Sequence, residues 1–289
     1  MEYIGRIIRP PSEADSILLQ VTVGCSHNKC DFCGAYKDKR FAIKTDEQIL
    51  QDIVFAREHC QRQRRVFLCD GDGLIIPQKR LLFILDAIRQ ELPWVTRIGT
   101  YGNAKAVQRK TPEELRELRE HGLGIVYMGL ESGDDEILAR MHKWGASRDM
   151  IREAEKLRQA GIKLNVTVLL GLGGIRESQR HARNTGRVLS AIDPEQAAAL
   201  TLMLIPGTPL HGAWEQGNFQ LPDSMTILRE LRTMLEHTTL SRGLFLSNHA
   251  SNYLPLKIRL PRDKEAALER IDQALAGKLF LTPETSRRL

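Results

Sequence analysis

Short runs of apolar, often β-branched residues alternate along the chain with longer segments of helical periodicity, and this alternation limits the possible folds most. It predicts β–α–β units, which build an α/β fold around a parallel sheet. Such units close into a partial barrel or form an open doubly wound sheet, and the pattern alone does not separate the two. We expect strands at residues 16–23, 65–69, 96–101, 124–130, 163–171 and 198–205, with helices between them near residues 45–60, 78–91, 112–121, 147–160 and 178–192.

The chain has 289 residues, of which 42% are hydrophobic, so it is long enough to bury a full core. Residues 1–15 are expected to form a lead-in, and residues 16–210 carry the alternating pattern. The pattern then changes to two helices, expected near residues 222–240 and 262–275. We therefore expect an α/β core followed by a helical C-terminal extension over residues 211–289.

Glycine and polar residues collect where the expected strands end. The first strand leads into a loop with three cysteines. Both candidate architectures bind ligands at the carboxyl ends of their strands, so we expect the functional site at these positions. The later strands lead into CDGDG (69–73), YGN (101–103), ESGDD (131–135), GLGG (171–174) and PGTP (206–209).

The cysteine loop, TVGCSHNKCDFCGAY, holds Cys25, Cys30 and Cys33 in the spacing C-x4-C-x2-C. The chain has five cysteines, an odd number, and these three lie too close together for a secreted disulfide framework. We therefore expect reduced thiols and a cytoplasmic protein. Three thiolates are suitable ligands for zinc or for an iron–sulfur cluster.

The two metals place different demands on the rest of the chain. A structural zinc site is normally closed by a fourth ligand, and the candidates here are His27, Cys60 and Cys69. A four-iron cluster with three protein ligands leaves one iron open to a substrate or cofactor. The position of the loop, directly after the first expected strand, suits such an open site.

With these features in this order, the sequence resembles the radical S-adenosylmethionine (SAM) superfamily over residues 16–210. The resemblance implies a partial (β/α)6 TIM-like barrel whose mouth the C-terminal extension covers. It also implies that Cys25, Cys30 and Cys33 hold a [4Fe–4S] cluster whose open iron binds SAM. Reductive cleavage of SAM then gives a 5′-deoxyadenosyl radical that abstracts hydrogen from a substrate. The usual family spacing is C-x3-C-x2-C, so the loop here is one residue longer.

The resemblance also assigns cofactor contacts to the first two strand ends. Phe32 matches an aromatic residue that packs near the adenine of SAM. Asp70, Gly71 and Asp72 match in position the stretch that receives the methionyl amino group, although the usual GGE is altered. On the residues alone, Asp70 and Asp72 also suit a turn with local backbone hydrogen bonds.

The third and fourth strand ends supply further candidates. Tyr101 and Asn103 stand at the same edge and are expected to bind the cofactor, although Tyr101 also suits a packing role. Glu131 and Ser132 match a polar pair that contacts the methionyl carboxylate or ribose. The segment that follows, Asp134 included, also suits a helix cap.

The fifth and sixth strand ends resemble the part of the family that contacts adenine. Gly171 and Gly173 match a glycine-containing turn that passes the adenine. Pro206 and Gly207, within LMLIPGTPL, resemble the loop of the branch that includes coproporphyrinogen dehydrogenases, the Elongator catalytic subunit and methylthiotransferases.

The rest of the chain narrows the reaction type. No cysteine follows Cys69, which disfavours members with auxiliary clusters and those that methylate RNA through a C-terminal cysteine. The segment SNHASNY, residues 247–253, is the best candidate for substrate contact. His249 and Tyr253 are candidate proton or hydrogen donors, although Ser247 or Asn248 also suits a helix cap there.

Charge and apolar content bear on the partners. The net charge is +6, but the positive residues are dispersed, so a small-molecule substrate is favoured over RNA. No run approaches the roughly 20 apolar residues of a membrane span, so no membrane partner is expected. A flavodoxin or ferredoxin would supply the electron. The alternatives are an RNA-modifying member of the superfamily and a non-catalytic, metal-binding or redox-sensing module.

Overall fold

The computed structural model describes residues 1–288 and divides the chain into two compact units. Each unit is assembled from segments that are separate in the sequence, so each is described by itself. Unit 1 comprises Met1–Asn28, Ala35–Met128 and Glu153–Leu164. Unit 2 comprises Lys29–Gly34, Gly129–Arg152 and the chain from Asn165 onward.

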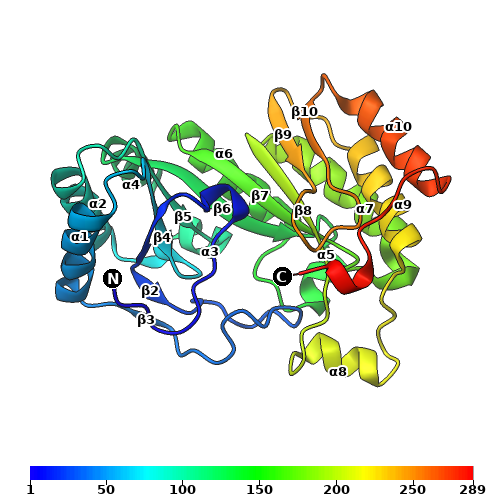
Figure 1. The fold of residues 1–289 in the computed structure, drawn as a ribbon, viewed down its shortest axis with the longest axis horizontal. Coiled ribbons are helices and arrows are strands. Elements are labelled where there is room, and N and C mark those ends of the chain that lie inside the picture. The colour runs from blue at the N-terminus through cyan, green and yellow to red at the C-terminus, as the bar shows by residue number, and fades with distance from the viewer. Residues whose placement is uncertain (289) are drawn as a thin grey trace. The chain divides into compact units, whose positions relative to one another are not determined.

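Unit 1 is built on parallel strands in the order β1, β4, β5, β6. Neighbouring helices α1 and α2 lie side by side, as do α2 and α4 (Figure 1). A short antiparallel pair, β2 and β3, follows β1. The strands are β1 (Ile17–Gln20), β2 (Thr22–Val23), β3 (Ala42–Ile43), β4 (Arg65–Cys69), β5 (Arg97–Tyr101) and β6 (Leu123–Glu131), which runs on into unit 2. The helices are α1 (Asp46–His59), α2 (Gln78–Glu91), α3 (Ala104–Gln108) and α4 (Pro112–Glu120), with 3-10 turns η1 (Pro11–Glu13) and η2 (Gly73–Ile75).

Two helices of unit 1 begin where local side-chain chemistry fixes their first turn. Thr45 caps α1 and forms a capping box with Gln48. Thr111 does the same for α4 with Glu114, and Pro112 occupies the first helical position. These caps satisfy backbone N–H groups that have no partner inside the helix. The starts expected for both helices are confirmed.

Unit 2 continues with parallel pairs β7–β8 and β8–β9, and β10 joins β9 in the antiparallel direction. Its strands are β7 (Lys163–Leu170), β8 (Gln196–Thr201), β9 (Gly243–Leu246) and β10 (Lys257–Leu260). Its helices are α5 (Asp135–Arg140), α6 (Ser147–Gln159), which runs into unit 1, α7 (Gly174–Ile192), α8 (Pro209–Glu215), α9 (Ser224–Glu236) and α10 (Lys264–Leu275), with a last 3-10 turn η3 (Glu284–Ser286).

The α/β class and the parallel strands predicted from the sequence are confirmed. The helix expected at 178–192 begins earlier, at Gly174, and the strand expected to reach residue 205 ends at Thr201. The two helices expected near residues 222–240 and 262–275 are α9 and α10, and the same part of the chain also forms β9 and β10. Each of these strands has only four residues and lies next to a polar loop, so its pattern was too short to predict a strand. A separate extension over residues 211–289 stays a prediction.

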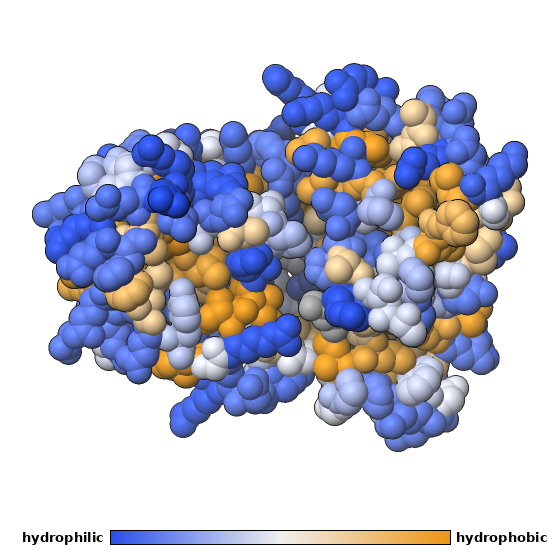
Figure 2. All heavy atoms as spheres, viewed as in Figure 1, coloured by the Kyte–Doolittle hydropathy of each residue, from blue (hydrophilic) through white to orange (hydrophobic). Residues whose placement is uncertain are grey.

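Hydrophilic residues cover much of the face drawn in Figure 2, and smaller hydrophobic areas lie between them. Fully buried side chains such as Phe67 in unit 1 and Phe245 in unit 2 form the interior of each unit. Among residues 1–288, no helix is long and apolar enough to cross a membrane.

Helices α7 and α9 of unit 2 pack closely because a glycine lies at their contact. A Cβ atom at Gly186 would lie 2.6 Å from the Met234 carbonyl oxygen and 2.9 Å from the His237 Cβ. Real Cβ atoms do not approach backbone so closely. The axes of α7 and α9 can therefore approach only if this position has no side chain.

We expect Gly186→Ala to lower the free energy of unfolding by about 1–3 kcal/mol because the new methyl group overpacks this contact. The matched control is Gly212→Ala in α8, where a Cβ would meet nothing within 4 Å. That change should leave stability unchanged or raise it by roughly 0.5–1 kcal/mol. Urea unfolding of both variants measures the difference, and equal effects would contradict the close packing.

Candidate functional site

In unit 1 the turn after β4 lies directly against the first cysteine. The Gly71 N–H donates to the Gly24 carbonyl oxygen at 3.1 Å. A Cβ atom at Gly71 would lie 2.8 Å from Tyr36 Cε2 and 3.1 Å from Cys25 Cβ. Position 71 therefore has no room for a side chain. The structure brings Cys25 and the Asp70–Asp72 turn together, as their positions after neighbouring strands predicted.

Asp70 is fully buried and is held through one of its two carboxylate oxygens. Its Oδ2 accepts from Gln20 Nε2 at 3.1 Å and from the Gly24 N–H at 3.2 Å, and it forms an ion pair with Lys39 Nζ at 3.1 Å. Its Oδ1 is buried and has no hydrogen-bond partner among the described residues. Lys39 balances the charge of Asp70, and one oxygen remains available to a ligand.

Asp72 is fully buried as well, but no ion pair balances its charge among residues 1–288. Its Oδ2 accepts from Ser26 Oγ and, at 2.7 Å, from Asn103 Nδ2. Its Oδ1 is buried and unpartnered. Burial raises the pKa of Asp72 to about 7, and the hydrogen bonds from Ser26 and Asn103 oppose this rise. A cationic group would favour the ionised form of this carboxylate.

The other two expected residues of this edge differ in their surroundings. Asn103 caps α3 through its oxygen and bonds Asp72 through its nitrogen, so it belongs to the same cluster. Tyr101 packs edge-on against Phe67 with ring centroids 5.0 Å apart. Burial raises the pKa of Tyr101, so its hydroxyl stays protonated. A cofactor contact by Tyr101 stays a prediction.

In unit 2 the segment with the other two cysteines forms a tight turn. The Cys33 N–H donates to the Cys30 carbonyl oxygen at 3.3 Å. Between them, the Asp31 N–H donates to the Met141 carbonyl oxygen and the Asp31 carbonyl oxygen accepts from the Leu210 N–H, both at 3.1 Å. The turn is therefore fixed by the end of α5 and the start of α8.

Phe32 lies in the same turn and is partly buried. It packs against an apolar cluster at the base of the loops that follow β7 and β8, whose buried members are Ile137, Met141, Leu172, Leu202 and Leu210. An aromatic ring at this place offers a flat apolar surface. Stacking of adenine on this ring stays a prediction.

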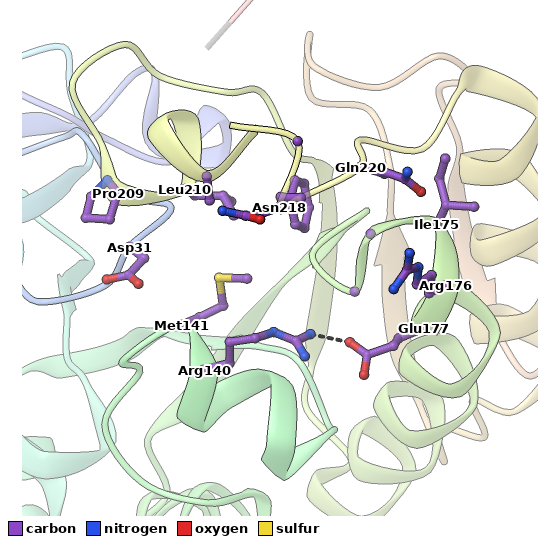
Figure 3. A pocket seen from close by; sticks show the side chains of 15 residues that line it. Asp31, Arg140, Met141, Ile175, Arg176, Glu177, Pro209, Leu210, Asn218 and Gln220 are labelled. Carbon is purple, nitrogen blue, oxygen red and sulfur yellow. Dashed lines mark hydrogen bonds and ion pairs between the residues drawn. The ribbon is translucent and has the colours of Figure 1, made fainter. Parts of the chain in front are cut away.

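An open cleft of about 500 Å³ lies beside this turn, within unit 2. Figure 3 shows its walls: Arg140 and Met141 come from the end of α5, Ile175, Arg176 and Glu177 from the start of α7, and Pro209, Leu210, Asn218 and Gln220 from α8 and the loop after it. Asp31 and Gly173 also line it. Arg140 forms an ion pair with Glu177 across the cleft. Of the expected cofactor residues, Gly173 is placed at this cleft.

The remaining strand-end residues of unit 2 are engaged within the protein. Glu131 has a left-handed φ of 66° and forms an ion pair with Lys143 at 3.2 Å. Ser132 is fully buried and bonds His181, and the Gly171 N–H donates to Glu230. These contacts support the backbone at the ends of β6 and β7.

Pro206 and Gly207 form the turn before α8. Gly207 has a left-handed φ of 81°, and a Cβ there would meet nothing within 4 Å. The left-handed backbone conformation therefore favours glycine at position 207, although the surrounding space would accept a side chain. Its adenine contact stays a prediction.

The segment SNHASNY is tied down on several sides. Ser251 Oγ accepts the Thr201 N–H at 3.1 Å and Asn252 Nδ2 donates to the Ala199 carbonyl oxygen at 2.9 Å, so the segment lies along the end of β8. His249 Nδ1 lies 2.9 Å from Ser251 Oγ. Burial lowers the pKa of His249, which favours the neutral imidazole.

Tyr253 is buried in a network with the C-terminal tail. Its hydroxyl donates to Glu284 Oε2 at 2.6 Å and accepts from Arg287 Nη1 at 2.6 Å. Burial, together with the hydrogen bond to Glu284, raises the pKa of Tyr253 to about 12. Arg287 also donates to the carbonyl oxygens of Ser251 at 2.7 Å and Leu202 at 3.1 Å. The tail thus fixes the segment, and any catalytic role of Tyr253 stays a prediction.

Comparison with known proteins decides the family. Residues 19–184, more than half of the chain, match the family model described as "Radical SAM superfamily". This chain belongs to the radical SAM superfamily. Members of the superfamily use a [4Fe–4S] cluster and SAM, and the predicted partial (β/α)6 TIM-like barrel agrees with this membership.

Individual relatives of this radical SAM protein are distant. An uncharacterized protein of Methanocaldococcus jannaschii is 23% identical over 84% of this chain and 77% of its own length. Two solved structures share the fold. A radical SAM methyltransferase from Kitasatospora setae has a TM-score of 0.57 and 19% identity over 69% of this chain. Coproporphyrinogen III oxidase from Escherichia coli, which lies in the branch suggested by the sequence, has a TM-score of 0.56 and 15% identity over 76%. The chain spans only 36% and 52% of these two proteins.

Several supporting residues were not predicted from the sequence. Gln20 and Lys39 hold Asp70, His181 and Glu230 support the ends of β6 and β7, and Arg287 fixes SNHASNY. Each acts on a residue far away in the sequence, and none belongs to a motif. An acid in the middle of an amphipathic helix, such as Glu230 in α9, gives no signal that it is buried.

We expect Arg287→Ala to lower the free energy of unfolding by about 2 kcal/mol or more, because it removes several hydrogen bonds from a buried charged group. The neighbouring Arg288 is exposed, so Arg288→Ala should change stability by less than about 0.5 kcal/mol. Urea unfolding gives the free energies, and hydrogen exchange of residues 247–253 should rise only in the first variant. Equal exchange in both variants would contradict the role of Arg287.

Proposed function

We propose that the chain is a radical SAM enzyme in which Cys25, Cys30 and Cys33 hold a [4Fe–4S] cluster. When bound, the cluster supplies the electron that cleaves SAM and so starts hydrogen abstraction from a small-molecule substrate. The donor set suits this group, because thiolates are the ligands of iron–sulfur clusters and three of them leave one iron for SAM. A cytoplasmic flavodoxin or ferredoxin is the proposed reductant.

The observation that carries the proposal is the Asp70–Asp72 turn against Cys25. Two buried carboxylates each keep one oxygen without a partner, and Gly71 presses the turn onto the cysteine loop. A buried carboxylate oxygen without a hydrogen-bond donor raises the free energy of the folded protein unless a ligand supplies the donor. The methionyl ammonium group of SAM is a cation with three N–H donors, which fits this requirement.

Asp72 is the better counter-ion of the two. Lys39 already balances Asp70, whereas Asp72 forms no ion pair among residues 1–288 and accepts from neutral donors that include Ser26 and Asn103. We therefore assign the ammonium group to Asp72 and a supporting hydrogen bond to Asp70. Asn103 orients Asp72, because the Asn103 side-chain nitrogen donates to Asp72 Oδ2. The Asn103 side-chain oxygen is fixed at the same time, because it caps α3 by accepting the Ala106 N–H.

The strand-end residues of unit 2 stay proposed cofactor contacts within their own unit. Phe32 would offer its ring to the adenine, and Gly173, Pro206 and Gly207 would leave space for the nucleoside. Glu131 would act through its carboxylate, which Lys143 holds at 3.2 Å. Tyr101 in unit 1 would contribute packing to the cofactor site.

His249 and Tyr253 are proposed as proton or hydrogen donors after the radical step. The neutral imidazole of His249 is half-buried and keeps Nε2 for a substrate, because only Nδ1 is engaged with Ser251. The hydroxyl of Tyr253 lies between Glu284 and Arg287. Donation of a proton or hydrogen atom by the Tyr253 hydroxyl would therefore require its hydrogen bonds to Glu284 and Arg287 to rearrange.

Anaerobic reconstitution should load about four irons per chain, and reduction with SAM present should release 5′-deoxyadenosine. Single changes Cys25→Ala, Cys30→Ala and Cys33→Ala should each remove the cluster absorbance and the cleavage. Cys60→Ala, outside the loop, is the matched control and should keep both. Stable binding of zinc with no cleavage of SAM would discard the proposal.

Asp72→Asn should raise the Michaelis constant for SAM by about tenfold or more, because the amide removes the negative charge that meets the ammonium group. The matched control is Asp38→Asn, an exposed acid of the same unit, and it should leave this constant unchanged. The rate of 5′-deoxyadenosine release against SAM concentration measures both. If the two variants bind SAM equally well, Asp72 is not the counter-ion.

A further inference from the structure

Unit 2 contains a buried polar cluster that no step of the proposed reaction uses. Its members are Ser132 after β6, Ser178 and His181 in α7, and Glu230 in α9. Ser132, His181 and Glu230 are 0% exposed and Ser178 is 2% exposed. A buried acid and imidazole are costly unless their hydrogen bonds are satisfied, so their arrangement needs a reason.

Glu230 reaches from α9 to the end of β7. Its Oε1 accepts the Gly171 N–H at 2.6 Å, and its Oε2 accepts from Ser178 Oγ. Gly171 has a left-handed φ of 88°, so the chain turns sharply at the point that Glu230 holds. His181 Nε2 lies 3.5 Å from the same Oε1.

His181 extends the contact to the end of β6. Its Nε2 lies 3.1 Å from the Leu169 carbonyl oxygen and must donate there, because a carbonyl oxygen only accepts. Its Nδ1 forms a hydrogen bond of 2.8 Å with Ser132 Oγ, which also accepts the Asp134 N–H at 3.0 Å. A serine, a histidine and a glutamate in contact resemble the triad of a hydrolase, but here His181 Nε2 donates to the Leu169 carbonyl oxygen, and Glu230 accepts the Gly171 N–H. The acid therefore holds a turn and does not orient the imidazole.

We propose that Glu230 and His181 are positioning residues that fix the turns after β6 and β7 for SAM binding. The inference rests on the proposed function, because those turns carry Ser132, Gly171 and Gly173. The polar atoms of Ser132 and Gly171 are used inside the protein, so these residues act on SAM through the shape of their turns. Gly173, two residues beyond Gly171, lines the cleft of unit 2.

The packing of α9 makes the contact rigid. Gly186 lets α7 and α9 approach closely, and a Cβ at Gly173 would lie 3.1 Å from His181 Cβ, which is closer than an ordinary contact. His181 is held in α7 and Glu230 in α9. A substitution at Glu230 should therefore change the turn at Gly171 while α9 stays in place. The C-terminal extension thereby contributes to cofactor binding without touching the cofactor.

The test compares Glu230→Ala, Glu230→Gln and the control Glu236→Ala, an exposed acid of the same helix. Glutamine keeps an acceptor for Gly171 and a partner for Ser178, whereas alanine removes both. Two quantities are measured on the full chain reconstituted with iron and sulfide. They are hydrogen exchange of residues 169–175 without SAM, and the dissociation constant of SAM by equilibrium dialysis.

We expect Glu230→Ala to speed exchange at Gly171 and to weaken SAM binding by about tenfold, with the rate at saturating SAM nearly unchanged. Glu230→Gln should stay within about threefold of the wild type, and Glu236→Ala should match it. If Glu230→Ala does not fold, Ser178→Ala should weaken SAM binding by about threefold.

The outcomes separate the two proposals. If the wild type and Glu230→Ala bind SAM equally well, the positioning role is wrong and the proposed function is unaffected. Wild-type protein that binds no SAM overturns the proposed function itself. Equal losses in Glu230→Ala and Glu230→Gln would show that the charge matters and the hydrogen bonds do not, and would also overturn the positioning role.

Discussion

The candidate site depends on a carboxylate that is buried without an ion pair among residues 1–288. Asp72 Oδ2 accepts from Ser26 and Asn103, and its Oδ1 has no side-chain or backbone hydrogen-bond partner within that range. Asp70, two residues away, shows the alternative, because Lys39 lies 3.1 Å from it. Lys39 thus compensates one of these two charges, while the other has neutral donors. The turn after β4 therefore combines an uncompensated buried carboxylate with a close approach to Cys25, which the lack of a side chain at Gly71 permits.

The sequence allowed much of this to be predicted. The strands of the core, the helix starts near residues 45 and 112, and the position of the Asp70–Asp72 turn all follow from local patterns. What could not be predicted depends on residues far apart in the chain. Lys39 meets Asp70, and Glu230 meets Gly171, only after the chain has folded. The strands β9 and β10 are short, so pairing makes them strands and local propensity does not: β9 pairs with β8, and β10 pairs with β9.

Membership of the superfamily defines the cofactors more sharply than the reaction. The solved structures that share the fold include a methyltransferase and an oxidase, and they share under 25% identity with this chain. The fold therefore does not select between their reactions. The same holds for the SNHASNY segment fixed by Arg287 and for the cleft with Arg140 and Glu177, whose substrate contacts stay predictions.

The hydrogen bond from Gly171 to Glu230 has a consequence for how this protein is divided into modules. The match to the family model ends at residue 184, yet the acceptor for the Gly171 N–H lies at residue 230. A fragment cut near residue 210 would leave that amide without its acceptor and uncover the face of α7 that packs on α9 at Gly186. A truncation or domain exchange at that point would therefore separate the turn at Gly171 from its support in α9.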